Sequence, residues 1–139
     1  MVLSKEIINY LQNTGLPSSI NQNFLLTDFN KIIYAATFND NAYYLNNTLS
    51  NDLIELINNW LNNSSEDSYI IKSKNTLSIV QNDLKRYSAQ LFLPIFEQKN
   101  LIGIAIFFRN YGDYIESSLK TPKTIKNFIQ LHLNNKTVI

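Results

Sequence analysis

The stretch "FLPIFEQKNLIGIAIFFR", residues 92–109, decides the fold. Two apolar runs flank the four polar residues "EQKN", which is a suitable length for a hairpin turn. Both runs are apolar at successive positions, and such runs are typical of strands that are buried on both faces. The sequence therefore predicts a central antiparallel hairpin that is covered on both sides.

A proline and a glycine interrupt this hairpin. Pro94 lacks an N–H, so we expect it at a bulge, at an unpaired position, or where the neighbouring strand ends. Gly103 has no side chain to pack inside a strand. Its presence predicts that a helix or a bound ligand approaches the sheet closely at that point.

Composition limits the classes of protein to consider. The chain has 139 residues, of which 45% are hydrophobic and 17% charged, as expected for one globular domain. A net charge of +1 gives no basic excess for direct binding of nucleic acid. Because the chain has no cysteine, it has no disulfide, no thiol nucleophile and no thioether-linked chromophore. No apolar run reaches the roughly 20 residues of a membrane span or resembles a signal peptide, so we expect a cytoplasmic, membrane-independent protein.

Apolar spacing and turn residues place the remaining elements. Asp28 follows a strand and is expected to accept hydrogen bonds from turn amides. Thr121 is expected to cap the last helix, with Pro122 at its first position. Expected in order are helix 4–14, strands 24–26 and 32–36, a helix capped by Ser50, strands 68–73 and 76–81, the central hairpin, and helix 114–134. Residues 1–139 thus form one α+β domain, with the sheet and its cover over residues 22–110.

Several of these pieces resemble the GAF domain family. They are "FLLTDFNKIIYAA", "YYLNNTLSNDLIELI", "RYSAQLFLPIFEQKNLIGIAIFF" and the last helix, in this order, over about residues 22–133. Within the family, the carboxy-terminal sensor domain of stage V sporulation protein T is the most similar in pattern. In that protein a DNA-binding hairpin precedes the sensor domain, and about 20 residues are too few for it here. The chain therefore looks like the sensor part alone, or like a piece of a longer regulator.

The resemblance implies a definite architecture. It implies a GAF/PAS-like antiparallel sheet of five or six strands, with helices packed on one face and the two terminal helices together. Loops and a short helix would roof the other face. It also implies a homodimer through the terminal helices, which polar substitutions at Ile7 and Ile129 are expected to weaken.

The residues needed for catalysis or metal binding are missing from the sequence. His132 is the sole histidine, and it is expected to be a partly exposed residue near a helix C-terminus. One histidine without cysteine does not make a zinc site or a catalytic triad. The three glycines are too scattered for a phosphate-binding loop. We therefore expect no enzymatic activity, no cofactor and no metal.

If the domain has a ligand, a few residues are candidates for binding it. Tyr34, Phe38, Tyr43 and Tyr44 lie in segments that the resemblance places at the roof, although such aromatic residues often simply fill a core. Arg86 and Ser88 enter the central strand, where Arg86 is suited to hold an anionic group of a small metabolite with an apolar part. An ordinary solvated strand entry is the alternative for both.

The sequence thus favours a non-enzymatic regulatory domain that dimerises and senses a small molecule, of the type attached to sporulation or transcription regulators. The alternative is a structural adaptor of the roadblock or longin type, which uses a similar α+β dimer to bind proteins without a ligand.

Overall fold

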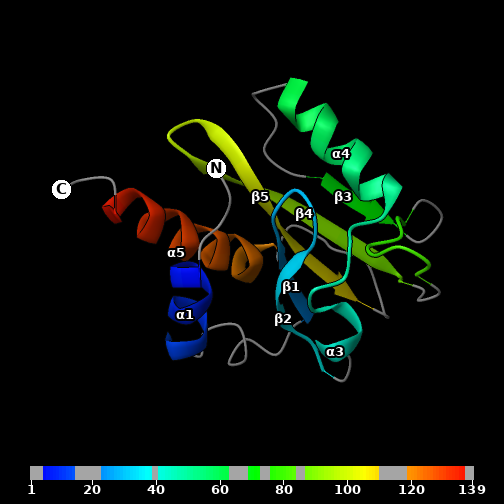
Figure 1. The fold of residues 1–139 in the computed structure, drawn as a ribbon, viewed down its shortest axis with the longest axis horizontal. Helices are drawn as coiled ribbons and strands as arrows, with labels where there is room; N and C mark the ends of the chain where they lie inside the picture. The colour runs from blue at the N-terminus through cyan, green and yellow to red at the C-terminus, as the bar shows by residue number, and fades with distance from the viewer. Residues whose placement is uncertain are drawn as a thin grey trace.

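The structure is a computed structural model that describes residues 5–14, 23–38, 41–62, 69–72, 76–83, 87–109 and 119–136. Helices lie on both faces of a twisted antiparallel sheet with strand order β2-β1-β5-β4-β3 (Figure 1). The elements are α1 (Lys5–Thr14), β1 (Asn23–Thr27), β2 (Ile32–Ala36), α3 (Asn41–Tyr44), α4 (Asn51–Asn62), β3 (Tyr69–Lys72), β4 (Ala89–Glu97), β5 (Asn100–Arg109) and α5 (Lys120–Lys136).

The quoted stretch forms the β4–β5 hairpin, as predicted. Its strands lie second and third from one edge of the sheet and are buried along nearly their whole length. The pairs described between β3 and β4 run from Ala89 to Phe92, and on the other side Pro94 is paired with Ile104 of β5. Whether the neighbouring strand ends beside Pro94 stays a prediction, because residues 63–68 lie outside the described residues.

An irregularity in β5 accounts for Gly103. Ile95 pairs with Gly103 and Phe96 pairs with Leu101, so Ile102 is an extra residue in β5 and forms a β-bulge. The side-chain amide of Gln130 on α5 bonds to the backbone N–H and C=O of Phe96 opposite this bulge. A helix therefore does reach the sheet here, although it contacts the partner strand of the glycine.

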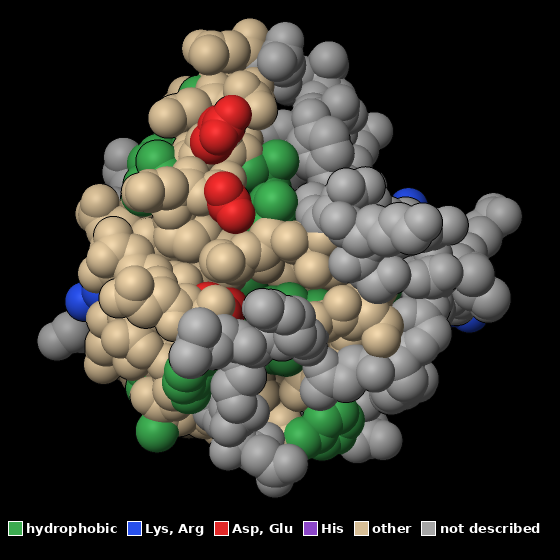
Figure 2. All heavy atoms as spheres, turned by 90° about the vertical axis from the view of Figure 1, so that its right-hand side faces the viewer, with side chains coloured by type: hydrophobic (Ala, Val, Ile, Leu, Met, Phe, Trp, Pro, Cys, Tyr) green, Lys and Arg blue, Asp and Glu red, His purple; other side chains and the backbone are tan. Residues whose placement is uncertain are grey.

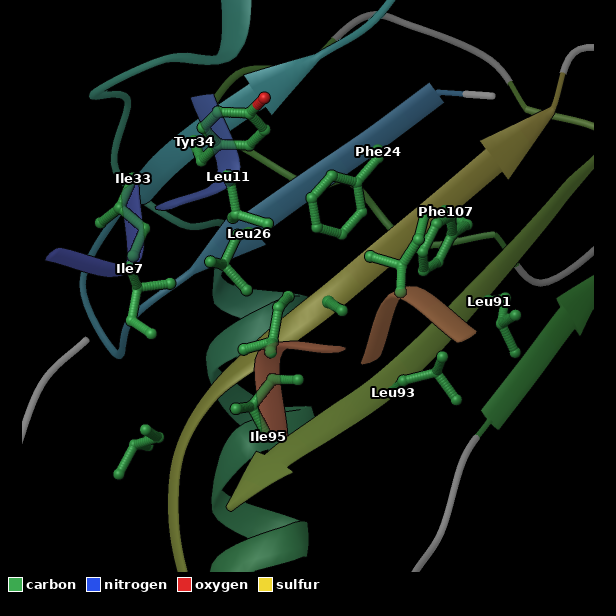
Figure 3. Close-up of a cluster of buried hydrophobic side chains, with 14 of the residues drawn as sticks. Ile7, Leu11, Phe24, Leu26, Ile33, Tyr34, Leu91, Leu93, Ile95 and Phe107 are labelled. Carbon is green, nitrogen blue, oxygen red and sulfur yellow. The ribbon is translucent and has the colours of Figure 1, made fainter. Parts of the chain in front are cut away.

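Two apolar cores fill the two sides of the sheet. The first core joins α1 and α5 to the sheet through residues such as Ile7, Leu11, Ile125 and Ile129, and part of it is shown in Figure 3. The second core joins α3, α4 and residues 76–83 to the opposite face. We call α3, α4 and the segments 45–50 and 76–83 the roof.

Two sequence-based expectations need correction. Helices do not lie on one face only, because α4 covers the face opposite α1 and α5. The segment 76–81 is not a strand; it crosses the roof, and only Val80 forms a bridge, to Leu49. The apolar stripe of α4 needs a sheet face to cover, and this requirement explains the second helical layer.

The terminal helices lie together, as expected, but with different boundaries. The ring of Tyr10 in α1 stacks on His132 in α5 with a centroid distance of 4.3 Å. α5 begins at Lys120, and Lys123 N–H donates to the carbonyl of Leu119, so Thr121 lies inside the first turn and is not the cap. Residues 114–118 of the expected helix 114–134 lie outside the described residues, as does residue 4 of the expected helix 4–14. None of the helices in the described part of the chain is long and apolar enough to cross a membrane.

Candidate functional site

The roof holds a hydrogen-bonded group of polar side chains in apolar surroundings. Its first feature is the carboxylate of Asp83, which is 8% exposed. Asp83 Oδ1 accepts a hydrogen bond from Tyr43 Oη at 2.8 Å, and Oδ2 accepts from Tyr87 Oη at 2.8 Å and from the Ile79 N–H at 3.1 Å. The hydroxyls of Tyr87 and Tyr44 are 2.8 Å apart and share a further hydrogen bond. We call these five residues the Asp83 network.

The network joins pieces of chain that are distant in sequence. Tyr43 and Tyr44 come from α3, Ile79 and Asp83 from the segment over the sheet, and Tyr87 from the entry to β4. Burial is the main cause that raises the pKa of Tyr87 above its ordinary value, followed by the hydrogen bond from Tyr44 and the nearby Asp83 carboxylate. The Tyr87 hydroxyl therefore stays protonated at neutral pH and can serve as a donor.

Gln90 gives the roof a second anchor. Its side chain is fully buried on β4, accepts from the Leu77 N–H at 2.7 Å and donates to the Leu77 carbonyl at 2.7 Å. The Gln90 amide thus makes the two hydrogen bonds that a neighbouring strand would make, and it satisfies both the N–H and the C=O of Leu77. This arrangement fixes the height of the 76–83 segment above the sheet.

A polar groove of about 440 Å³ opens at the start of α4. Its walls are Ser50, Asn51, Asp52, Ser78, Val80, Gln81 and Asn82. Ser50 caps α4 by accepting from the Leu53 N–H at 3.1 Å, as the sequence predicted, and its hydroxyl also donates to the carbonyl of Ser78. Hydroxyl, amide and carboxylate groups dominate the walls, so the groove suits a polar ligand that makes hydrogen bonds.

The predicted site residues are not brought together into one site. Tyr43 and Tyr44 both belong to the Asp83 network, and Tyr44 is 1% exposed. Tyr34 packs in the core on the opposite face, against Phe24 at a ring distance of 6.0 Å (Figure 3). The cause is a β-bulge: Leu26 pairs with Tyr34 and Thr27 with Ile32, so the extra residue between them turns Tyr34 away from the roof.

The other three predicted residues have separate surroundings. Phe38 is 56% exposed after β2, and its N–H donates to Asn23 Oδ1 at 3.1 Å. Ser88 is half-buried and donates its N–H to the Arg109 carbonyl at 2.8 Å, which is ordinary strand pairing. Arg86 lies outside the described residues. Asp28 has its predicted turn role, because Oδ1 accepts from the N–H groups of Asn30 and Lys31.

Sequence reasoning missed Asp83 and Gln90. The partners of Asp83 include Tyr43, which is 40 residues away, and the only local signal is the turn pair "ND". Gln90 stands inside an otherwise apolar run, and a lone polar residue in such a run is the signal that could have marked it. The described residues contain no group of three or more His, Asp or Glu that could hold a metal ion.

Comparison with known proteins establishes the fold and goes no further. No protein-family model matches the chain, and neither does any curated protein. Among solved structures, a red/green cyanobacteriochrome in its red light-absorbing state is 12% identical, with a TM-score of 0.65 over 95% of this chain and 96% of that one.

Two further solved structures have the same fold. A GAF domain/HD domain protein from Geobacter sulfurreducens is 12% identical, with a TM-score of 0.63 over 96% of this chain and 94% of that one. A phycoerythrobilin-bound GAF domain of a cyanobacterial phytochrome has the same identity, TM-score and coverage. The chain therefore has a GAF-like fold over nearly its whole length, and nothing in these likenesses is specific to a sporulation protein.

Proposed function

We propose that this chain is a non-enzymatic, cytoplasmic regulatory domain of GAF type that dimerises and senses a small molecule, of the kind attached to sporulation or transcription regulators. The observation that carries the proposal is the polar groove in the roof of a GAF-like fold. The phycoerythrobilin-bound structure supports it, because the same fold there holds a small molecule. A thioether-linked bilin is not available to this chain, which has no cysteine.

The walls of the groove indicate the class of ligand. The expected metabolite is small and polar, with several groups that donate or accept hydrogen bonds, because serine and amide side chains surround the groove. Tyr43 and Asp83 lie in the same part of the roof and couple the 76–83 segment to α3. A ligand in the groove therefore contacts the segment that also holds the Asp83 network. Arg86 remains the predicted partner for an anionic group.

A thermal-shift screen with amino acids, nucleotides and cofactors tests sensing. A ligand at about 100 times its dissociation constant adds about 2.7 kcal/mol, which is about 5 to 10 °C in Tm for a chain of this size. We expect the shift to disappear in Gln81→Trp, which fills the groove, and to persist in Asn58→Trp, which changes an exposed residue of α4 away from the groove walls. Loss of the shift in Arg86→Ala would support the anionic group.

The structural adaptor is a second candidate, and one observation favours it. The space between sheet and roof is filled by side chains of the described residues, including Tyr44, Leu53 and Ile79, each at most 1% exposed. A protein-binding domain needs no cavity there. If no compound shifts Tm and the protein is a stable dimer, the sensing proposal is wrong and the adaptor is favoured.

The dimer requires a different surface from the one first expected. Ile7 and Ile129 are fully buried within one copy, so polar substitutions there would unfold the domain and not test the interface. We propose that the outward face of α1, with Asn9, Gln12 and Asn13 exposed, pairs with a second copy alongside the adjoining edge of α5. Sedimentation velocity of Asn9→Glu/Gln12→Glu should show a monomer, and an unchanged dimer would contradict this interface.

A further inference from the structure

Most polar side chains that line the groove at the start of α4 make no hydrogen bond with another described residue. These side chains belong to Asn51, Asp52, Ser78, Gln81 and Asn82. The Ser50 hydroxyl, by contrast, is already used for the α4 cap and for the Ser78 carbonyl. Three amides, one hydroxyl and one carboxylate are therefore available to a ligand, and each has an oxygen that accepts hydrogen bonds.

The wall of the groove carries negative charge. Among its described residues Asp52 is the only ionisable one, and Glu55 follows one turn later on α4. Both are exposed, and neither has an ion pair with another described residue. Figure 2 shows carboxylate side chains in red on the upper part of the face that carries α4, with basic side chains in blue only at its margins.

No positive side chain of the described roof offsets these carboxylates. The described residues of the roof include no lysine, arginine or histidine. Lys31 bridges to Thr48 beside the roof, but it is not part of the groove wall. A groove lined by charge of one sign attracts ligands of the opposite sign, so this one favours a cation and opposes an anion.

The N-terminus of α4 does not reverse this preference. A helix N-terminus carries about half a unit of positive charge on its first N–H groups, and by itself it would attract an anion. Asp52 places a full negative charge in the same turn, and the Ser50 hydroxyl already accepts from the Leu53 N–H. The groove therefore differs from an ordinary phosphate or carboxylate site at a helix end.

An ammonium group matches these surroundings. It has three N–H donors and no acceptor, so it requires oxygen atoms around it. The Asp52 carboxylate can accept a charge-assisted hydrogen bond, and the amide oxygens of Asn51 and Asn82 can accept the others. A divalent metal ion is matched less well, because the described residues contain no group of three His, Asp or Glu.

We propose that the groove binds a small hydroxylated amine, whose ammonium group pairs with Asp52 and whose hydroxyl groups bond to the amides of Gln81 and Asn82. This inference rests on the proposed sensing function and adds to it the charge of the ligand. An anionic group for Arg86 would then belong to another part of the same molecule.

Three sugars with similar rings and different charges test the proposal at slightly acidic pH: glucosamine is cationic, glucose neutral and glucuronate anionic. Amide NMR shifts at residues 50–52 and 78–82 of the full chain give a Kd for each. We expect glucosamine to bind about three- to fivefold tighter than glucose, as for an exposed ion pair, and glucuronate to bind more weakly than glucose. High salt should narrow these differences.

Variants of α4 separate the ion pair from net charge. Asp52→Asn should lower the affinity for glucosamine to that for glucose and leave the affinity for glucose nearly unchanged. Glu55→Gln makes the same change of charge away from the groove wall, so we expect it to lower the affinity for glucosamine less than about twofold. The Tm of each variant checks that it is folded.

Three results would overturn the proposal. Glucuronate may bind as tightly as glucosamine, Asp52→Asn may weaken both sugars equally, or glucosamine may move none of the groove amides. If another compound still gives the thermal shift that Gln81→Trp abolishes, the sensing function stands and only the class of ligand is wrong. If no compound gives a shift, the sensing function is wrong as well.

Discussion

Removing the Asp83 carboxylate should destabilise the roof by a predictable amount. In Asp83→Ala the buried N–H of Ile79 loses its acceptor, which costs about 1–3 kcal/mol, and Tyr87 loses a bond to a charged group, worth about 1.5–3 kcal/mol. Tyr87 keeps its bond to Tyr44, and the half-buried Tyr43 hydroxyl can turn to water. Since such terms are not additive, we expect a total loss of about 3–4 kcal/mol.

Asp83→Asn separates hydrogen bonding from charge. Asparagine keeps one carbonyl oxygen for the two donors at Oδ2, and its NH₂ can donate to the Tyr43 hydroxyl, so we expect a loss of only about 1–2 kcal/mol. Urea unfolding measures both variants; with a slope near 2 kcal/mol/M, the alanine variant should lose about 1.5 M in midpoint. A loss below about 1 kcal/mol for alanine, or a larger loss for asparagine, would refute the reasoning.

Three more predictions concern the pH response, the α5 contact and the hairpin turn. Burial raises the pKa of Tyr87 in the folded state, so the unfolded chain loses this proton first as the pH rises. The free energy of unfolding should therefore fall from about pH 10 upward by about 1.4 kcal/mol per pH unit. Urea titrations of Tyr87→Phe should show a smaller fall. Gln130→Ala removes both bonds to the Phe96 backbone and should cost about 2 kcal/mol, with faster amide exchange near the bulge. Gln98→Asn/Lys99→Gly should stabilise the protein by about 1 kcal/mol in thermal unfolding, because φ is 51° and 72° at these positions.

Each of these has a matched control. Asn127→Ala changes an exposed amide on the same helix as Gln130 and should change stability by less than about 0.5 kcal/mol. Asn82→Gly, at φ 60°, should gain less than the hairpin variant, since asparagine tolerates this conformation. Equal alkaline destabilisation with and without the Tyr87 hydroxyl would contradict the assignment of that titration.

Features that depend on residues close together in the sequence were predicted well. Asp28 and Ser50 act through amides within three residues, and both roles were predicted from the local sequence. Pro94 lies within β4, where its missing N–H restricts pairing, and its place relative to the end of β3 stays a prediction. Fold class followed from the continuous apolar hairpin in the same way.

The candidate site was predicted less well, since it depends on register and on distant contacts. One extra residue at Ile33 reverses the side on which Tyr34 lies, and nothing in the local pattern announces that bulge. Asp83 has its role only when the tertiary fold brings α3 and the start of β4 next to it. The second helical layer forms because α4 packs on a face of the sheet, which the local sequence does not specify. Aromatic composition alone could not separate a roof residue from a core residue.

The sheet order has a consequence for synthesis of the chain. β1 lies between β2 and β5, and Asn23 is paired with Phe108, 85 residues later. On the ribosome the edge of β1 that faces β5 must therefore stay without that partner until Phe108 has been made. During that interval α1 has no β4 or β5 to cover, so its apolar face and the edge of β1 are both unprotected in the nascent chain.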